Sequence, residues 1–159
     1  MAKKKSSAKE LASQNKRLLT QLRKKKEGAL DRQINELDEK AFQTIDCLTC
    51  ANCCKTTGPL FTDKDIVRIS KHLKLKPGKF VENYLRIDED NDYVLQQLPC
   101  PFLDHENYCT IYNVRPKACA EYPHTQMRGQ KKMLPLLLKN AQICPAVENI
   151  LAELKKHTL

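Results

Sequence analysis

The sequence has no tryptophan and only four glycines among 159 residues. It therefore has no glycine-rich loop to cradle a nucleotide or S-adenosylmethionine, which argues against a self-contained, doubly wound methyltransferase. No apolar run approaches the roughly 18 residues that cross a membrane. The basic N-terminus is not followed by an apolar segment, so we expect no secretory signal and a cytoplasmic protein with reduced thiols.

The familiar catalytic motifs are also missing from the sequence. We find no G-x-S-x-G turn, no H-E-x-x-H helix and no P-loop. The sequence therefore leaves open whether the protein is an enzyme.

The net charge of +9 comes from the N-terminus. Residues 1–26 contain ten lysines and arginines against one glutamate, whereas the rest of the chain is neutral. The spacing of Ser7 and Glu10 fits a capping box at the start of a charged helix. We therefore predict a basic helical arm over residues 1–28. Weak electrostatic contact with nucleic acid or acidic surfaces is one role for it, and a solvated arm that aids solubility is the other.

Cysteine is abundant, and half of the eight cysteines lie within one stretch of eight residues. The candidate ligands are Cys47, Cys50, Cys53, Cys54, Cys100, Cys109, Cys119 and Cys144. Thiols crowded like this indicate disulfides, metal binding or redox chemistry. Because we expect a reducing compartment, metal binding is favoured over disulfides.

The spacing Cys47-x2-Cys50-x2-Cys53 allows a tight loop to turn three sulfur atoms toward one point. Bacterial ferredoxins begin their iron–sulfur motif in this way, but their C-x3-C-P ending is missing here. Further ligands must come from across the fold, and either an iron–sulfur cluster, with 4Fe-4S favoured, or zinc satisfies the pattern. The side chains of the adjacent Cys53 and Cys54 are expected to diverge. Whether there is one site or two stays open.

Two later cysteines lie at predicted helix starts. Cys144 precedes Pro145, and Cys119 follows Pro116, which is at the favoured first position of a helix. The unpaired N–H groups of a helix start lower the pKa of a nearby thiol, so we expect both thiols to ionise readily.

The remaining pattern predicts a mainly α fold with a small β-hairpin, that is, a small metal-stabilised α+β cysteine-cluster domain over residues 29–159. An amphipathic helix is expected from about Asp31 to Ile45, and the pair Thr62 and Asp65 resembles a capping box. The hairpin is predicted from residues 85–87 and 93–95 around an acidic loop. A last helix begins at Pro145, whereas residues 124–140 show no clear pattern.

The cysteine motif, followed by Cys100-Pro-Phe-Leu and Cys109-x-Ile-Tyr-x2-Arg-Pro-x2-Cys119-x2-Tyr-Pro, resembles the YkgJ-type cysteine-cluster family over about residues 45–145. That family is described as a zinc- or iron-chelating domain, so the resemblance implies a metal site more than an activity. The motif is also distantly similar to flagellin lysine N-methylase, where the cysteines are associated with an iron–sulfur cluster. The resemblance thus implies, as an alternative, an iron–sulfur-dependent protein-modifying enzyme. It also marks Tyr112, Arg115, Tyr122 and Pro123 as signature residues.

Overall fold

The computed structural model describes residues 8–159, so the predicted N-terminal tail and the capping residue Ser7 lie outside the described part. By the density of its contacts, the chain divides into two units. Unit 1 runs up to Thr44 and resumes over His124–Leu159, and unit 2 is Ile45–Pro123. The structure is mainly α with a small three-stranded antiparallel sheet, which confirms the predicted fold class. None of the helices in residues 8–159 is long and apolar enough to span a membrane.

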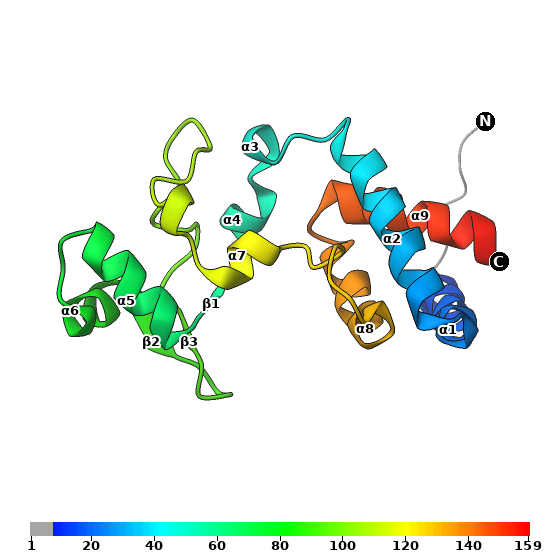
Figure 1. The fold of residues 1–159 in the computed structure, drawn as a ribbon, viewed down its shortest axis with the longest axis horizontal. Helices are drawn as coiled ribbons and strands as arrows, with labels where there is room; N and C mark the ends of the chain where they lie inside the picture. The colour runs from blue at the N-terminus through cyan, green and yellow to red at the C-terminus, as the bar shows by residue number, and fades with distance from the viewer. Residues whose placement is uncertain (1–7) are drawn as a thin grey trace. The chain divides into compact units, whose positions relative to one another are not determined.

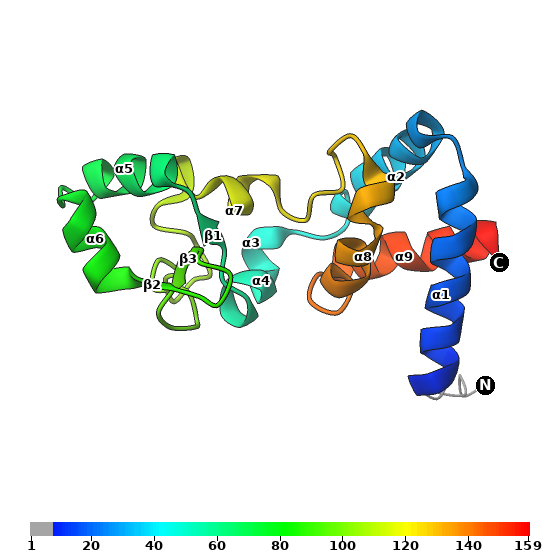
Figure 2. The same ribbon diagram turned by 90° about the horizontal axis from the view of Figure 1, so that it is seen from below.

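Unit 1 is a helical bundle (Figures 1 and 2). Its helices are α1 (Ala8–Lys24), α2 (Glu27–Phe42), α8 (Gln130–Asn140) and α9 (Pro145–Thr158). Helices α1 and α2 both pack against α8 and α9. The predicted arm therefore packs within unit 1 through α1, and its role as a separate functional segment over residues 1–28 stays a prediction.

The apolar positions of α2 face the bundle as the sequence pattern predicts. Leu30, Ile34 and Ala41 are buried. The helix nevertheless begins at Glu27, earlier than the predicted start, and includes Gly28 in its first turn. It also ends at Phe42, before the predicted end.

Helix α8 has no clear sequence pattern, because Pro135 lies inside it and removes one of its backbone donors. Its N-cap, Gly129, has a left-handed φ of 80° and no side chain to act as a cap. The carboxylate of Asp31 on α2 takes that role, since it accepts hydrogen bonds from the backbone N–H of Gly129 (3.1 Å) and Gln130 (2.9 Å). A carboxylate at a helix N-terminus is stabilising, so α2 helps to fix the start of α8.

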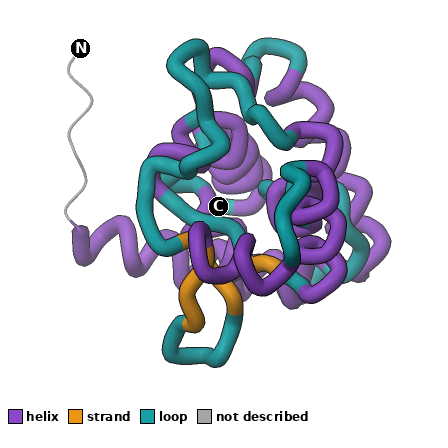
Figure 3. Tube along the Cα trace, turned by 90° about the vertical axis from the view of Figure 1, so that its left-hand side faces the viewer, coloured by secondary structure: helices purple, strands orange, loops and turns teal. Residues whose placement is uncertain are grey.

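Unit 2 contains the short elements and the sheet, whose strands are drawn in orange in Figure 3. Its elements are α3 (Cys47–Cys50), α4 (Asn52–Thr56), β1 (Leu60–Phe61), α5 (Asp63–His72), α6 (Pro77–Tyr84), β2 (Leu85–Ile87), β3 (Tyr93–Leu95), the 3-10 helix η1 (Tyr112–Val114) and α7 (Lys117–Glu121). The strand order is β1-β3-β2.

The predicted hairpin is confirmed, with Leu85 opposite Leu95 and Ile87 opposite Tyr93. The capping box of α5 is also confirmed: the Thr62 hydroxyl accepts from the Asp65 N–H, and the Asp65 side chain accepts from the Thr62 N–H. Strand β1 was not predicted, because two residues are too short to show an alternating pattern.

Aromatic rings form the centre of the core of unit 2. Phe80 is fully buried, and its ring centroid lies 5.3–6.2 Å from those of Phe61, Tyr84 and Phe102. Cys100 and Cys109 pack against the same core. The core therefore supports the segments that carry these thiols.

Candidate metal centre

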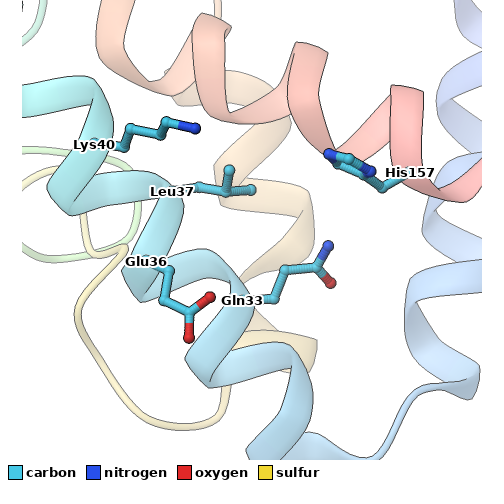
Figure 4. A pocket seen from close by; sticks show the side chains of 5 residues that line it. All are labelled: Gln33, Glu36, Leu37, Lys40 and His157. Atoms are coloured by element: carbon cyan, nitrogen blue, oxygen red, sulfur yellow. The ribbon is translucent and has the colours of Figure 1, made fainter.

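A hollow on unit 1 contains no cysteine. It has a volume of about 380 Å³ and is lined by Gln33, Glu36, Leu37, Lys40 and His157 (Figure 4). The side chains that line it are acidic, basic, polar and apolar, as on most of a protein surface, and they suggest no particular ligand. The candidate site therefore has to be sought in unit 2, which holds seven of the eight cysteines.

The Cys47–Cys54 stretch forms two short helices in place of the expected tight loop. The Asp46 side chain caps α3 by accepting a hydrogen bond of 2.9 Å from the Leu48 N–H. Buried Ala51 then adopts a left-handed φ of 47°, which ends α3 and starts α4 in a new direction. The kink places the first two cysteines on α3 and the last two on α4.

The second half of unit 2 returns to α4 through the backbone. The N–H of Cys100 donates a 2.8 Å hydrogen bond to the carbonyl oxygen of Cys54. Cys109 then pairs with Leu103 in an antiparallel bridge, which holds it in the same segment as Cys100. Cys119 lies on α7, and α7 packs against β1.

The electrostatics show that five thiols gather: Cys53, Cys54, Cys100, Cys109 and Cys119. Burial raises the pKa of the Cys100 thiol, and the neighbouring Cys109 and Cys53 raise it further. Burial also raises the pKa of Cys109. The pKa of Cys119 rises to about 12, first through burial and then through Cys100, Cys109 and Cys53. Thiols that disfavour one another's ionisation lie close together, so the fold brings these five into one group.

The prediction that the helix start lowers the thiol pKa is wrong for Cys119. Cys119 does lie in the first turn of α7, but the pKa is raised because burial and the neighbouring thiols oppose the charged form. A helix of only five residues has a small dipole to offset them. The sequence shows the helix start but not the burial.

The expectation that the side chains of Cys53 and Cys54 diverge is also wrong, since their sulfur atoms lie 4.0 Å apart. The hydrogen bond between the two thiols raises the pKa of Cys53 and lowers that of Cys54. The pair therefore favours one thiolate over two, with Cys54 the more readily ionised of the two thiols. Two thiolates on one tetrahedral zinc ion lie about 3.8 Å apart, so this pair alone has the spacing of two zinc ligands, whereas in an iron–sulfur cluster only one of the two would bind a given iron atom.

Arg115 is the cation beside this group. Its positive charge lowers the pKa values of Cys109 and Cys119, although burial outweighs it in both. The guanidinium lies 4.0 Å from the centroid of the Tyr112 ring and donates a 2.8 Å hydrogen bond to the Tyr112 carbonyl oxygen. The stack and the hydrogen bond hold the charge in place, so Arg115 favours the ionised thiols that a metal binds.

Three predicted ligands remain, and the segment that carries two of them is also tied to the Cys109 segment, because the Asn107 side chain donates a 3.4 Å hydrogen bond to the Thr49 carbonyl oxygen on α3. Cys47 is exposed and Cys50 is half-buried on α3. Cys144 belongs to unit 1, where it is the N-cap of α9 as predicted. The ligand roles of these three cysteines stay predictions from the sequence.

Two residues that support Cys119 were not singled out as site residues from the sequence. Asp65 and Arg68 of α5 hydrogen-bond to the backbone of residues 114–117, just before Cys119. The capping box identified Asp65 only for its role in α5. No pattern in the sequence indicates the second contact of Asp65 or the role of Arg68, because both depend on tertiary packing.

The chemistry of the donors suits a soft metal. Thiolates are the preferred ligands of zinc and of iron–sulfur clusters. A half-buried thiol with a raised pKa is protonated at neutral pH, and it loses its proton when the sulfur atom binds the metal. Among residues 8–159, however, no group of three or more Cys, His, Asp or Glu side chains is arranged to hold a metal ion. The type of donor thus fits zinc or iron, and binding requires the cysteine side chains to turn toward the metal.

Comparison with known proteins gives one family. A family model described as "CxxCxxCC: Putative zinc- or iron-chelating domain" matches residues 46–145, a range that includes all eight cysteines. The predicted resemblance to this cysteine-cluster family is thereby confirmed. No solved structure matches the chain.

Proposed function

The chain belongs to the CxxCxxCC family of zinc- or iron-chelating domains, and on that premise we propose that unit 2 binds its metal through the five gathered thiols. The observation that carries the proposal is the geometry around α4, where the Cys53 and Cys54 sulfur atoms lie 4.0 Å apart and the Cys100 N–H donates to the Cys54 carbonyl oxygen; the effects of Cys100, Cys109 and Cys119 on the pKa of Cys54 agree with it. Cys47, Cys50 and Cys144 are proposed as further ligands from the sequence alone.

We favour an iron–sulfur cluster, of the 4Fe-4S kind, over a single zinc ion. Each thiolate of such a cluster binds a different iron atom, so the thiols stand further apart than around one zinc ion. The five gathered thiols lie close enough to influence one another's ionisation, yet among residues 8–159 no three metal-binding side chains are arranged to hold a single metal ion. Such a cluster fits the reducing cytoplasm that the sequence predicts.

Metal analysis of anaerobically purified protein tests the proposal. Iron and sulfide in about equal amounts, with absorption in the visible range, support the cluster, because zinc leaves the protein colourless. Zinc alone supports metal binding and contradicts the cluster. Folded protein with neither metal, and with its cysteines paired in disulfides, contradicts both.

The iron–sulfur-dependent protein-modifying enzyme stays a hypothesis. The same anaerobic preparation tests it when it is incubated with candidate protein substrates and any mass change is recorded. A modification that is lost on removal of the metal supports an enzyme. Unmodified substrates with fully loaded protein support a binding module.

We also propose that α1 contacts nucleic acid through a basic stripe, which we define as Lys9, Lys16, Arg17, Arg23 and Lys24. These side chains are exposed. At about 100° per residue, they lie on the side of the helix opposite Leu18 and Leu22, which are fully buried. Because the bundle already covers these two leucines, they cannot insert into a lipid surface, and the phosphate backbone of nucleic acid is the better partner.

Fluorescence anisotropy with a labelled single-stranded RNA tests this contact. We expect weak binding that falls steeply with salt, since it depends on the release of counterions. The triple variant Lys9→Glu, Lys16→Glu, Arg23→Glu should abolish it, whereas Lys71→Glu on α5 should not. Binding that does not change with salt contradicts the proposal.

A further inference from the structure

Two side chains of α5 hold the backbone that leads into α7. Arg68 donates hydrogen bonds to the carbonyl oxygens of Arg115 (2.8 Å) and Val114 (3.3 Å). Its partner on the same helix is Asp65, at 2.6 Å. Arg68 thus joins α5 to a segment that lies about 46 residues later in the sequence.

Asp65 completes this connection from a buried position. It is 1% exposed, and one carboxylate oxygen accepts from both Arg68 and the backbone N–H of Lys117, the latter at 3.1 Å. The other oxygen accepts from the N–H and the hydroxyl of Thr62. A buried carboxylate with every bond made is fixed in direction, so it defines where Lys117 lies.

Helix α7 depends on Asp65 and Arg68, because α7 has no capping side chain of its own. It has only five residues, and its N-cap is Pro116, which offers no capping side chain. Isolated helices of this length are unstable in water. The Asp65 carboxylate therefore acts as the cap of α7, and Cys119 follows two residues after the capped N–H.

Helix α5, in contrast, is anchored. Ile66 and Ile69 are buried in the aromatic core, and α5 packs against α6 and η1. The side chains of Asp65 and Arg68 thus fix the start of the short helix α7 relative to the well-packed helix α5.

We propose that Asp65 and Arg68 are positioning residues that set the Cys119 thiol against the other four gathered thiols. The inference rests on the proposed metal binding, and it adds two residues that touch no thiol. Residues that orient metal ligands without touching the metal typically change its affinity about 10- to 100-fold when they are replaced.

The main variant is Arg68→Met, since the Arg68 side chain is 42% exposed and its loss should not unfold the protein. Arg68→Lys keeps the charge but replaces the planar guanidinium with a compact ammonium group, which cannot reproduce the contacts with Asp65 and both carbonyl oxygens together. The matched control is Lys79→Met on α6, because Lys79 forms a pair with Glu82 at the same i,i+3 spacing in the same unit. That pair is exposed and supports no cysteine segment.

Two measurements are made on each variant. Zinc affinity is measured by competition with a chromogenic chelator. The alkylation rate of each cysteine in the reduced, metal-free protein is measured by peptide mass spectrometry at one pH. The second measurement follows the position of Cys119 without any metal.

We expect Arg68→Met to weaken zinc binding about 10- to 100-fold and to speed alkylation of Cys119 several-fold, with Cys100 and Cys109 unchanged. Arg68→Lys should lie between Arg68→Met and wild type, and Lys79→Met should match wild type. Unchanged Cys119 alkylation in Arg68→Met overturns the inference, as does an equal acceleration of every cysteine, which indicates general loosening. If wild-type protein takes up neither zinc nor iron, the proposed function fails, while alkylation still decides whether Arg68 positions Cys119.

Discussion

The N–H of Cys100 donates a 2.8 Å hydrogen bond to the carbonyl oxygen of Cys54, and this bond joins the two halves of the cysteine motif through their backbones. It places the start of the Cys-Pro-Phe-Leu segment at the end of the crowded cysteine stretch. Since backbone groups make it, the contact survives substitution of either thiol. Thiol chemistry and local fold can therefore be tested separately at these positions.

Cys100→Ser should remove a metal ligand without removing that hydrogen bond. A serine hydroxyl stays protonated at neutral pH and is a poor ligand for a soft metal, so we expect metal affinity to fall at least about tenfold. Chelator competition and metal analysis measure the change. Thr56→Ser on α4 is the control, because it trims an exposed residue that holds no thiol. Full metal content and unchanged affinity in Cys100→Ser would exclude Cys100 as a ligand.

Phe80→Ala should destabilise unit 2, because Phe80 is fully buried against three other rings. Truncation of a buried phenylalanine costs about 3–5 kcal/mol. Hydrogen exchange resolved by peptide measures the effect in unit 2 alone, which matters because a chain of two units need not unfold in one step. Val67→Ala on α5 is the control; Val67 is 58% exposed and should change stability by less than about 0.5 kcal/mol. Equal exchange in the two variants would contradict the importance of the aromatic core.

Local sequence patterns predicted the elements whose determinants are local. The hairpin follows from two short apolar stretches around an acidic loop, and the start of α5 follows from Thr62 and Asp65. Helix α9 follows from Pro145 and the apolar positions behind it. In each case, neighbouring residues supply both the signal and the contacts.

Tertiary contacts account for what the sequence did not predict. Helix α8 contains Pro135 and takes its cap from Asp31, about 98 residues away, so no local pattern could mark it. The raised pKa of Cys119 depends on burial and on thiols from other segments. The contacts of Arg68 with residues 114 and 115 likewise have no local signal.

Asp31→Ala should destabilise α8 by removing its cap. The carboxylate accepts two backbone hydrogen bonds at the helix start, and loss of such a cap costs about 0.5–2 kcal/mol. Hydrogen exchange should therefore quicken in the first turn of α8. Glu39→Ala is the control, since Glu39 is an exposed acidic residue on the same helix, α2. Unchanged exchange at residues 129–133 in Asp31→Ala would show that the cap is dispensable.

Arg115→Met should weaken metal binding, because it removes the cation that favours ionised Cys109 and Cys119. We expect affinity to fall about tenfold, at the lower end of the usual effect of residues around a metal site. Arg115→Lys keeps the charge but not the planar stack on Tyr112, so it should retain part of the affinity. Arg86→Met, at an exposed position on β2, is the control. If Arg115→Met binds metal as tightly as wild type does, the role of Arg115 is confined to the turn around Tyr112.

The carboxyl group of Asp65 should make the stability of unit 2 depend on pH. Burial alone would raise the pKa of its carboxyl, but hydrogen bonds from Thr62, Arg68 and Lys117 outweigh burial and lower it below the ordinary value of 3.8. A carboxyl with a lowered pKa in the folded state adds stability at pH values above 3.8, and this contribution is lost as the pH falls through the folded-state pKa. Asp65→Asn should therefore cost about 1.5–3 kcal/mol near neutral pH, the usual value of hydrogen bonds to a charged group. The difference from wild type should shrink steadily below pH 3.8 as wild-type Asp65 becomes neutral.

Denaturant unfolding of the metal-free proteins between neutral and acid pH measures the stability of wild type and Asp65→Asn, with Glu82→Gln as the exposed control. A difference that stays constant down to the lowest pH would mean that the charge of Asp65 does not stabilise the fold.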